Sequence, residues 1–181
     1  MGSDLFSGSV GEISRRRIFY LVWLGINKPE LLDYVSVDSL IEVVAVLSSS
    51  DWRIKAYATL VMGMMTSRGI KLPEYVISEI IRLLSDSSEY VRSGAAWVLG
   101  KIGNSASSKE RCKVIYDSLA RLLNDSSWVV RAAAVNSLGE LRRDCNLPHE
   151  VVKGRLYDVL ISDKSAIVRK VAYNILKSYG E

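Results

Sequence analysis

Apolar residues recur along this chain with the spacing of one helix face, and the pattern returns about every 38 residues. The segment DSSEYVRSGAAWVLGKIG begins at Asp86, and its copies DSSWVVRAAAVNSLGELR and DKSAIVRKVAYNILKSYG begin at Asp125 and Asp163. Weaker copies, SSDWRIKAYATLVMGMMT and GEISRRRIFYLVWLGINK, begin at Ser49 and Gly11. Five copies in register indicate an internal repeat.

Each copy predicts an amphipathic helix. Counted from Val91, apolar residues stand at offsets 0, +4, +7, +8 and +11, which is the period of one helical stripe. We expect Asp86, Asp125 and Asp163 to cap the starts of three of these helices. The five predicted helices span residues 11–27, 51–66, 87–102, 127–142 and 165–179.

A second set of apolar stripes lies between these helices, and alternating strand patterns are missing from the sequence. The stripes run over residues 37–47, 76–84, 114–123 and 152–160. The chain therefore predicts antiparallel helix pairs, and because one pair cannot bury its own stripe, the pairs must stack. We expect an N-terminal extension over residues 1–10 and a single repeat domain over residues 11–181.

The pattern Asp-x4-Val-Arg, followed by small residues and Leu-Gly, resembles HEAT repeats. The matching residues are Asp86, Val91, Arg92, Ala95, Leu99 and Gly100, and they recur from Asp125 and partly from Asp163. The resemblance covers residues 11–180 and includes the Val-Arg-x-x-Ala variant of phycobilin lyase subunits. It implies an all-α fold, a right-handed α-solenoid of about four to five helical hairpins. It leaves the function open, because HEAT solenoids serve as scaffolds, transport receptors, enzyme subunits and DNA-binding enzymes.

A basic residue follows the first apolar position of every copy. These residues are Arg17, Lys55, Arg92, Arg131 and Arg169. The last three each stand six residues after an aspartate: Asp86, Asp125 and Asp163. We expect a structural ladder in which each arginine binds its own aspartate or that of the next repeat. The alternative is a stripe that follows a phosphate backbone.

The family geometry implies that the second helix of each pair lines a concave face, where offsets +2, +6 and +10 should face solvent. These positions are apolar in the first two copies and polar in the last three. The candidate partner-binding residues are Ile18, Val22, Leu60, Met64, Trp97, Lys101, Asn136, Lys170 and Asn174. The stretch 18–24 is apolar all round, so a partner, a second copy of the chain or the first ten residues should cover it.

Enzyme chemistry finds little support in the sequence. There is one histidine, His149, and neither metal-ligand spacing nor a glycine-rich phosphate loop is evident. We therefore predict no catalytic residue, no metal and no cofactor. Cys112 and Cys145 do not make a disulfide framework, so we expect free thiols and a cytoplasmic protein. No apolar run reaches the ~18 residues that a membrane span needs.

Charge distinguishes the two halves of the chain. Residues 1–90 carry 9 basic and 11 acidic side chains, whereas residues 91–181 carry 15 and 9. We predict a non-enzymatic scaffold that binds a protein or peptide, or a second copy of itself through the N-terminal helices. The first alternative is nucleic-acid binding through the basic half, as in the HEAT-like alkylpurine DNA glycosylases. An enzyme or lyase subunit is the second alternative.

Overall fold

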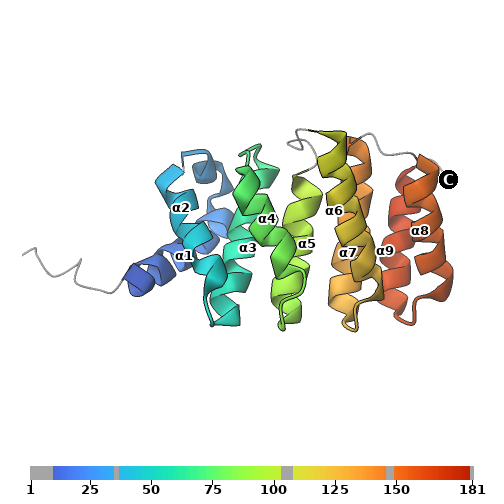
Figure 1. The fold of residues 1–181 in the computed structure, drawn as a ribbon, viewed down its shortest axis with the longest axis horizontal. Coiled ribbons are helices and arrows are strands. Elements are labelled where there is room, and N and C mark those ends of the chain that lie inside the picture. The colour runs from blue at the N-terminus through green and yellow to red at the C-terminus, as the bar shows by residue number, and fades with distance from the viewer. Residues whose placement is uncertain (1–9, 35–36, 103–107, 146–148, 180–181) are drawn as a thin grey trace, which may run out of the picture. The chain divides into compact units, whose positions relative to one another are not determined.

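The computed structural model describes residues 10–34, 37–102, 108–145 and 149–179 (Figure 1). Helices and short turns make up these ranges, and no strand occurs within them. The chain groups into two compact units, residues 1–70 and 71–181. Most of the expected N-terminal extension lies outside the described residues, and the single repeat domain over 11–181 stays a prediction.

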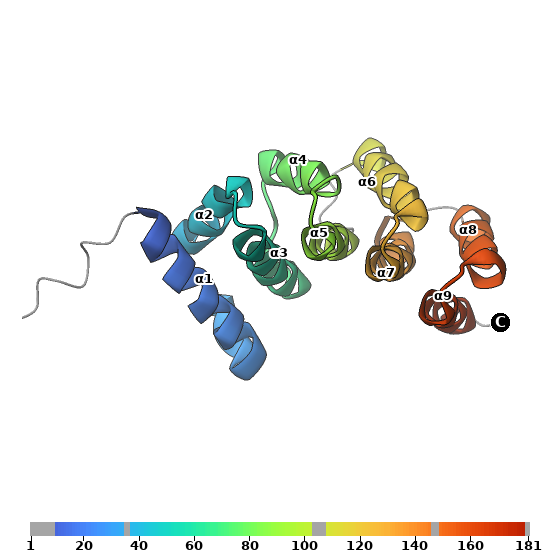
Figure 2. The ribbon, with the colours of Figure 1, turned by 90° about the horizontal axis from the view of Figure 1, so that it is seen from below.

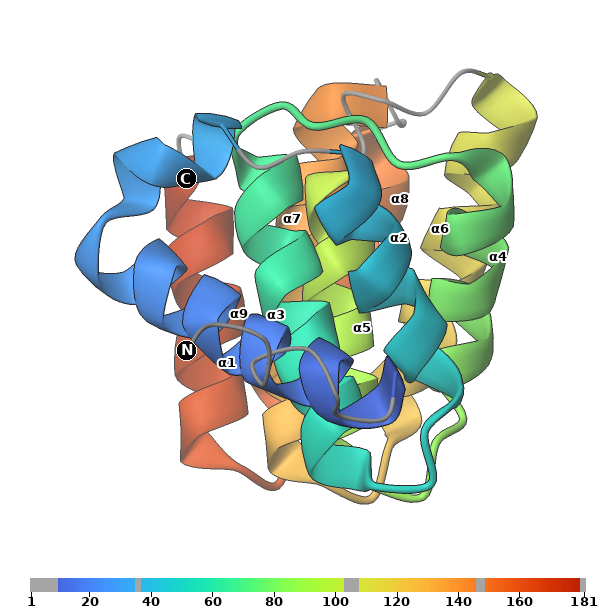
Figure 3. The ribbon, with the colours of Figure 1, turned by 90° about the vertical axis from the view of Figure 1, so that its left-hand side faces the viewer.

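Unit 1 is built from three α-helices and two short 3-10 helices. In chain order these are α1 (Val10–Asn27), η1 (Pro29–Tyr34), α2 (Val37–Ala45), η2 (Val46–Ser48) and α3 (Trp52–Ser67). Figure 3 shows α1 lying across α3, and the two helices are in contact. The buried apolar side chains of unit 1 include Ile18, Leu21, Leu32, Val43 and Leu47.

Unit 2 is a row of three helical hairpins. They are α4 (Glu74–Leu83) with α5 (Glu89–Lys101), α6 (Lys109–Arg121) and η4 (Leu122–Asn124) with α7 (Trp128–Cys145), and α8 (His149–Ser162) with α9 (Ala166–Ser178). Figure 2 shows that α4, α6 and α8 form one layer and α5, α7 and α9 the other. The five predicted second helices correspond to α1, α3, α5, α7 and α9, with ends that agree within three residues.

The two layers of unit 2 enclose the repeated apolar stripe. On α5 it consists of Val91, Ala95, Val98 and Leu99, each fully buried. Glycines then allow neighbouring second helices to approach closely. A Cβ atom on Gly100 would lie 2.8 Å from the Cα of Ser137, and one on Gly139 would lie 2.8 Å from Ile175.

The predicted helix caps are displaced by two residues. Ser88 and Ser165, rather than Asp86 and Asp163, are the N-cap residues of α5 and α9. The Oδ1 atom of Asp86 instead accepts the N–H of Ser88 at 2.9 Å, so the aspartate closes the turn before the helix. Asp125 and Asp163 accept the N–H groups of Ser127 and Ser165 in the same way, at 2.8 and 2.7 Å.

The expectation of two free thiols is wrong. Cys112 in α6 and Cys145 at the end of α7 form a disulfide, with their Cα atoms 5.8 Å apart. Because α6 and α7 are antiparallel, the start of the first helix lies beside the end of the second. Sequence spacing alone does not give this distance. The cytoplasmic location stays a prediction.

Candidate functional site

The arginine of α5 reaches the aspartate of the next repeat. Arg92 donates from Nε to Oδ2 and from Nη2 to Oδ1 of Asp125, both at 2.8 Å. Its Nη1 atom donates to the main-chain carbonyls of Asp86 at 2.9 Å and Ser87 at 3.1 Å. One guanidinium therefore ties its own turn to the following one.

Arg131 of α7 repeats this arrangement with Asp163. Nε and Nη2 donate to the two carboxylate oxygens at 2.7 and 2.9 Å, and Nη1 donates to the carbonyls of Asp125 and Ser126. Hydrogen bonds from Arg131 lower the pKa of Asp163, burial raises it, and the hydrogen bond from the Ser165 N–H lowers it. The net result is a pKa below the usual value of an aspartate. Carboxylates thus occupy Arg92 and Arg131, which removes both from a phosphate-tracking stripe.

The basic residues of the first and the last copy are bound differently. In unit 1, Arg17 donates from Nη1 to Oε1 of Glu42 at 2.9 Å, on the exposed surface. At the other end, Arg169 of α9 donates from Nη1 to the carbonyl of Asp163 at 2.6 Å. Within the ranges the structure describes, no carboxylate binds the Arg169 guanidinium.

The candidate binding residues of unit 2 lie on α5, α7 and α9. Asn136, Lys170 and Asn174 are exposed, and Trp97 is half-buried. Within the described part of the chain, the amides of Asn136 and Asn174 make no hydrogen bond. Lys101, by contrast, donates to Oε1 of Glu140 at 2.7 Å. We call Trp97, Asn136, Lys170 and Asn174 the asparagine face.

The candidate residues of unit 1 are placed differently. Ile18 is 1% exposed and Val22 is 9% exposed, so the expectation that they face solvent is wrong. Because α1 lies across α3, these offsets of α1 turn inward (Figure 3). Leu60 and Met64 are half-buried. Met64 fills the space beside Gly25, where a Cβ atom would come within 2.1 Å of its sulfur.

The exposed side of α1 carries an aromatic band, which the sequence pattern did not separate from the buried side. We define the aromatic band as Phe19, Tyr20, Trp23 and Ile26, all about half exposed or more. The ring of Phe19 packs edge-on against the ring of Tyr57, with centroids 5.0 Å apart. The rings of Tyr20 and Trp23 are stacked. The apolar character of the stretch 18–24 was the signal, but it gave no orientation. Cover by the first ten residues lies outside the described residues.

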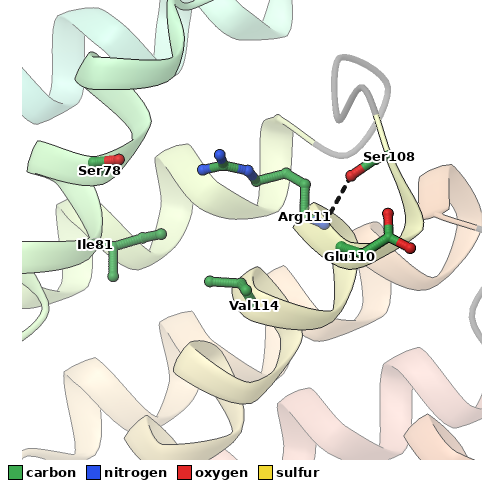
Figure 4. Close-up of a pocket in the computed structure, with 6 residues that line it drawn as sticks. All are labelled: Ser78, Ile81, Ser108, Glu110, Arg111 and Val114. Atoms are coloured by element: carbon green, nitrogen blue, oxygen red, sulfur yellow. Dashed lines mark hydrogen bonds between the residues drawn. The ribbon is translucent and has the colours of Figure 1, made fainter.

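A hollow of about 340 Å³ lies between α4 and α6 in unit 2 (Figure 4). Its lining residues are Ser78, Ile81, Ser108, Glu110, Arg111 and Val114. The guanidinium of Arg111 forms an ion pair with Glu74, and its main-chain N–H donates to Oγ of Ser108 at 3.1 Å. The hollow thus combines a paired arginine with two apolar side chains.

Among the described residues, no group of three or more His, Cys, Asp or Glu side chains could hold a metal ion. Over the same ranges, every helix is too short or too polar to cross a bilayer.

Comparison with solved structures identifies the class as all-α helical-repeat solenoids. The complex of CpcE and CpcF of phycocyanin lyase from Nostoc sp. PCC7120 matches with a TM-score of 0.66 at 18% identity, over 88% of this chain and 98% of that chain. A computationally designed armadillo repeat protein for modular peptide recognition matches with a TM-score of 0.63 at 16% identity, over 96% and 79%. Another, in complex with the peptide (KR)4, matches with a TM-score of 0.55 at 17% identity, over 94% and 90%.

At sequence identities of 16–18%, the likeness to these solved structures establishes the fold of the chain, and it confirms the resemblance to HEAT and armadillo repeats.

A family model matches residues 53–154, which is more than half of the chain. The chain belongs to the Cnd1 family, non-SMC mitotic condensation complex subunit 1. No curated protein sequence matches it.

Proposed function

We propose that this chain is a non-enzymatic scaffold that binds a protein or peptide partner on the asparagine face of unit 2. The observation that carries the proposal is the pair of exposed amides on neighbouring helices. Asn136 and Asn174 occupy equivalent repeat positions, and both are without a hydrogen bond in the described chain. A side-chain amide can donate to a carbonyl and accept from an N–H at once, as a peptide backbone requires.

The spacing of the helices suits an extended peptide. Packed helices lie about 8–10 Å apart, and an extended chain advances about 3.3 Å per residue. The side-chain amides of neighbouring helices can therefore bind main-chain groups of an extended peptide that are about three residues apart. Trp97 on α5 adds a half-buried aromatic surface beside them, and such residues often anchor interfaces.

The comparisons support a protein or peptide partner. Two of the similar structures are designed armadillo proteins, one described for modular peptide recognition and one in complex with a peptide. The family description names a subunit of a multiprotein complex. These comparisons do not identify the partner, because proteins that share a fold bind different partners.

The aromatic band of unit 1 is our proposed second contact, for a partner or for another copy of the chain. Three half-exposed aromatic rings on one helix offer the large apolar area that interface cores use. Light scattering of the wild type and of Trp23→Asp tests self-association. A dimer that becomes a monomer in the variant supports it, and a monomeric wild type contradicts it.

The asparagine face is tested with peptides selected from a random library on the immobilised chain. We expect the selected peptides to bind the Asn136→Ala/Asn174→Ala variant about tenfold more weakly, because two backbone-recognising amides are lost. Asp117→Ala/Asp158→Ala, on exposed positions of α6 and α8 in the opposite layer, is the matched control. Unchanged affinity in the asparagine variant would remove this face as the binding site.

Nucleic-acid binding through the basic half is the alternative that one observation favours. Helix α9 carries Arg169, Lys170 and Lys177 and no acidic residue. A gel shift that weakens steeply with salt and in Lys170→Glu would support this alternative. Absence of a shift at low salt would exclude it. A role as an enzyme or lyase subunit rests on the shared fold alone.

A further inference from the structure

The edge of unit 2 formed by α9 exposes positions that are covered in the earlier repeats. Ten residues after the repeat aspartate stand Ala96 and Val135, both fully buried, but Tyr173 at this position of α9 is 52% exposed. Fourteen residues after the aspartate stand two buried glycines, Gly100 and Gly139, whereas α9 has the exposed Lys177.

Arg169 sits on this edge in the pose of its two counterparts. Like Arg92 and Arg131, it donates from Nη1 to the carbonyl of the residue six positions earlier. In those counterparts, Nε and Nη2 bind a carboxylate of the next hairpin. At Arg169 the same two groups are without a carboxylate in the described chain. The guanidinium is therefore held in place while its acceptor is missing.

The side chains of the α9 edge disfavour a helix packed as closely as the internal helices of unit 2. At the position of Lys177, the earlier helices need glycine, because a Cβ atom on Gly100 would lie 2.8 Å from the backbone of Ser137. The side chains of Tyr173 and Lys177 hold another close-packed helix away. The same side chains disfavour a second copy stacked in this register. A segment thinner than a helix can reach Arg169 between them.

We propose that the α9 edge, formed by Arg169, Tyr173 and Lys177, binds an acidic peptide segment. One carboxylate takes the position on Arg169 that Asp125 and Asp163 take on Arg92 and Arg131. The three residues are spaced four apart, so they lie on one face over about 12 Å, the length of a few peptide residues. Lys177 supplies a second positive charge, and Tyr173 lies between the two with an apolar ring.

The charge around the edge favours an anionic partner, and the geometry favours a carboxylate over a phosphate. Helix α9 has no acidic side chain between Ala166 and Ser178. The internal copies of the site are filled by planar carboxylates that accept two parallel hydrogen bonds. This edge is distinct from the asparagine face, so the two proposals can fail independently.

The test follows the Nε–Hε signals of the arginines by NMR during a peptide titration. The probe is acetyl-Leu-Ser-Asp-Ser-Ser-Glu-Tyr-amide, the chain's own residues 84–90, and its control carries Asn for Asp and Gln for Glu. We expect the acidic peptide to shift the Arg169 signal and to leave Arg92 and Arg131 unchanged, because those two are already bound. The neutral peptide should shift none of them.

Variants separate the edge from general attraction between charges. Arg169→Gln should weaken binding of the acidic peptide by about tenfold, whereas Lys113→Gln, at an exposed lysine of α6, should change it by less than about twofold. If Arg169→Gln unfolds α9, Tyr173→Ala/Lys177→Gln provides a second disruption that keeps Arg169. Asn136→Ala/Asn174→Ala should leave this binding unchanged, which separates it from the proposed function.

Three outcomes would overturn the proposal. The first is equal binding of the acidic and neutral peptides, and the second is a folded Arg169→Gln variant with wild-type affinity. The third is saturation of the Arg169 signal by a short oligothymidine at lower concentration than by the acidic peptide, which would make the edge a phosphate site.

Discussion

The Arg131 guanidinium and the Asp163 carboxylate are joined by two parallel hydrogen bonds of 2.7 and 2.9 Å, and both side chains are about 95% buried. This pair links α7 to the turn that precedes α9. The same guanidinium also binds two main-chain carbonyls of its own turn. Burial and the number of bonds distinguish this pair from an exposed surface ion pair, which contributes little.

We expect Arg131→Ala to lower the free energy of unfolding by about 2–4 kcal/mol, because it leaves Asp163 buried without its partner. Urea unfolding followed by circular dichroism measures the loss. Arg169→Ala is the matched control, since it removes the same residue type from a position without a bound carboxylate, and it should cost clearly less. Equal losses in the two variants would show that the carboxylate contact is not what stabilises the ladder.

Acid should weaken the ladder. Bonds from Arg131 lower the pKa of Asp163, and at Asp125 burial acts upward but is outweighed by bonds from Arg92 and the Ser127 N–H. Because both folded pKa values lie below the unfolded value of about 3.9, the stabilisation is complete above that pH and is lost as pH falls through the folded values. Urea midpoints measured between about pH 2 and 5 should show this fall. The fall should be shallower in Arg131→Ala.

Gly100→Ala should destabilise the chain by about 1–3 kcal/mol, since its new Cβ would lie 2.8 Å from the Cα and side chain of Ser137. Gly154→Ala in α8 is the opposite case. A Cβ there has no neighbour within 4 Å, so the substitution should stabilise by about 0.5–1 kcal/mol through helix propensity. Thermal melting of the two single variants checks both signs. Stabilisation by Gly100→Ala would contradict the close approach of α5 and α7.

The disulfide between Cys112 and Cys145 closes a segment across a sequence separation of 33 residues. We expect Cys112→Ala/Cys145→Ser to lose about 3 kcal/mol relative to the oxidised chain, mainly through the entropy of the unfolded state. A reducing agent should lower the melting temperature of the wild type and leave the double variant unchanged. Alkylation of both thiols in the native, unreduced chain would show that the bond is absent.

Repetition explains why much of the fold could be predicted. The stripe around Val91, Val130 and Val168 recurs so regularly that helix positions agree with the structure within three residues. The ladder residues were also identifiable, because a basic residue follows the first apolar position of every copy, and in four of the five it is an arginine. Their pairing was open, since an aspartate of the same repeat and one of the next were both plausible partners. The way in which the hairpins stack decides which aspartate each arginine binds. Residue spacing within one repeat does not give that stacking.

The candidate site was harder to predict where helices cross differently. The offsets that face solvent on α7 and α9 place Asn136 and Asn174 outside, but on α1 the same offsets bury Ile18 and Val22. The repeat pattern assumes one packing geometry, and α1 lies across α3 instead. The disulfide was missed because antiparallel packing, rather than sequence distance, brings Cys112 to Cys145.

Two ladder aspartates, Asp125 and Asp163, have two roles each: they accept hydrogen bonds from an arginine of the preceding hairpin and from the main-chain N–H two residues ahead. The aspartate that binds the first turn of a helix is therefore itself bound by an arginine of the preceding hairpin. Unfolding one hairpin should loosen the first turn of its successor as well as uncover apolar surface. We expect these polar turns to couple the hairpins, so amide exchange at the starts of α7 and α9 should report on the integrity of the preceding hairpin.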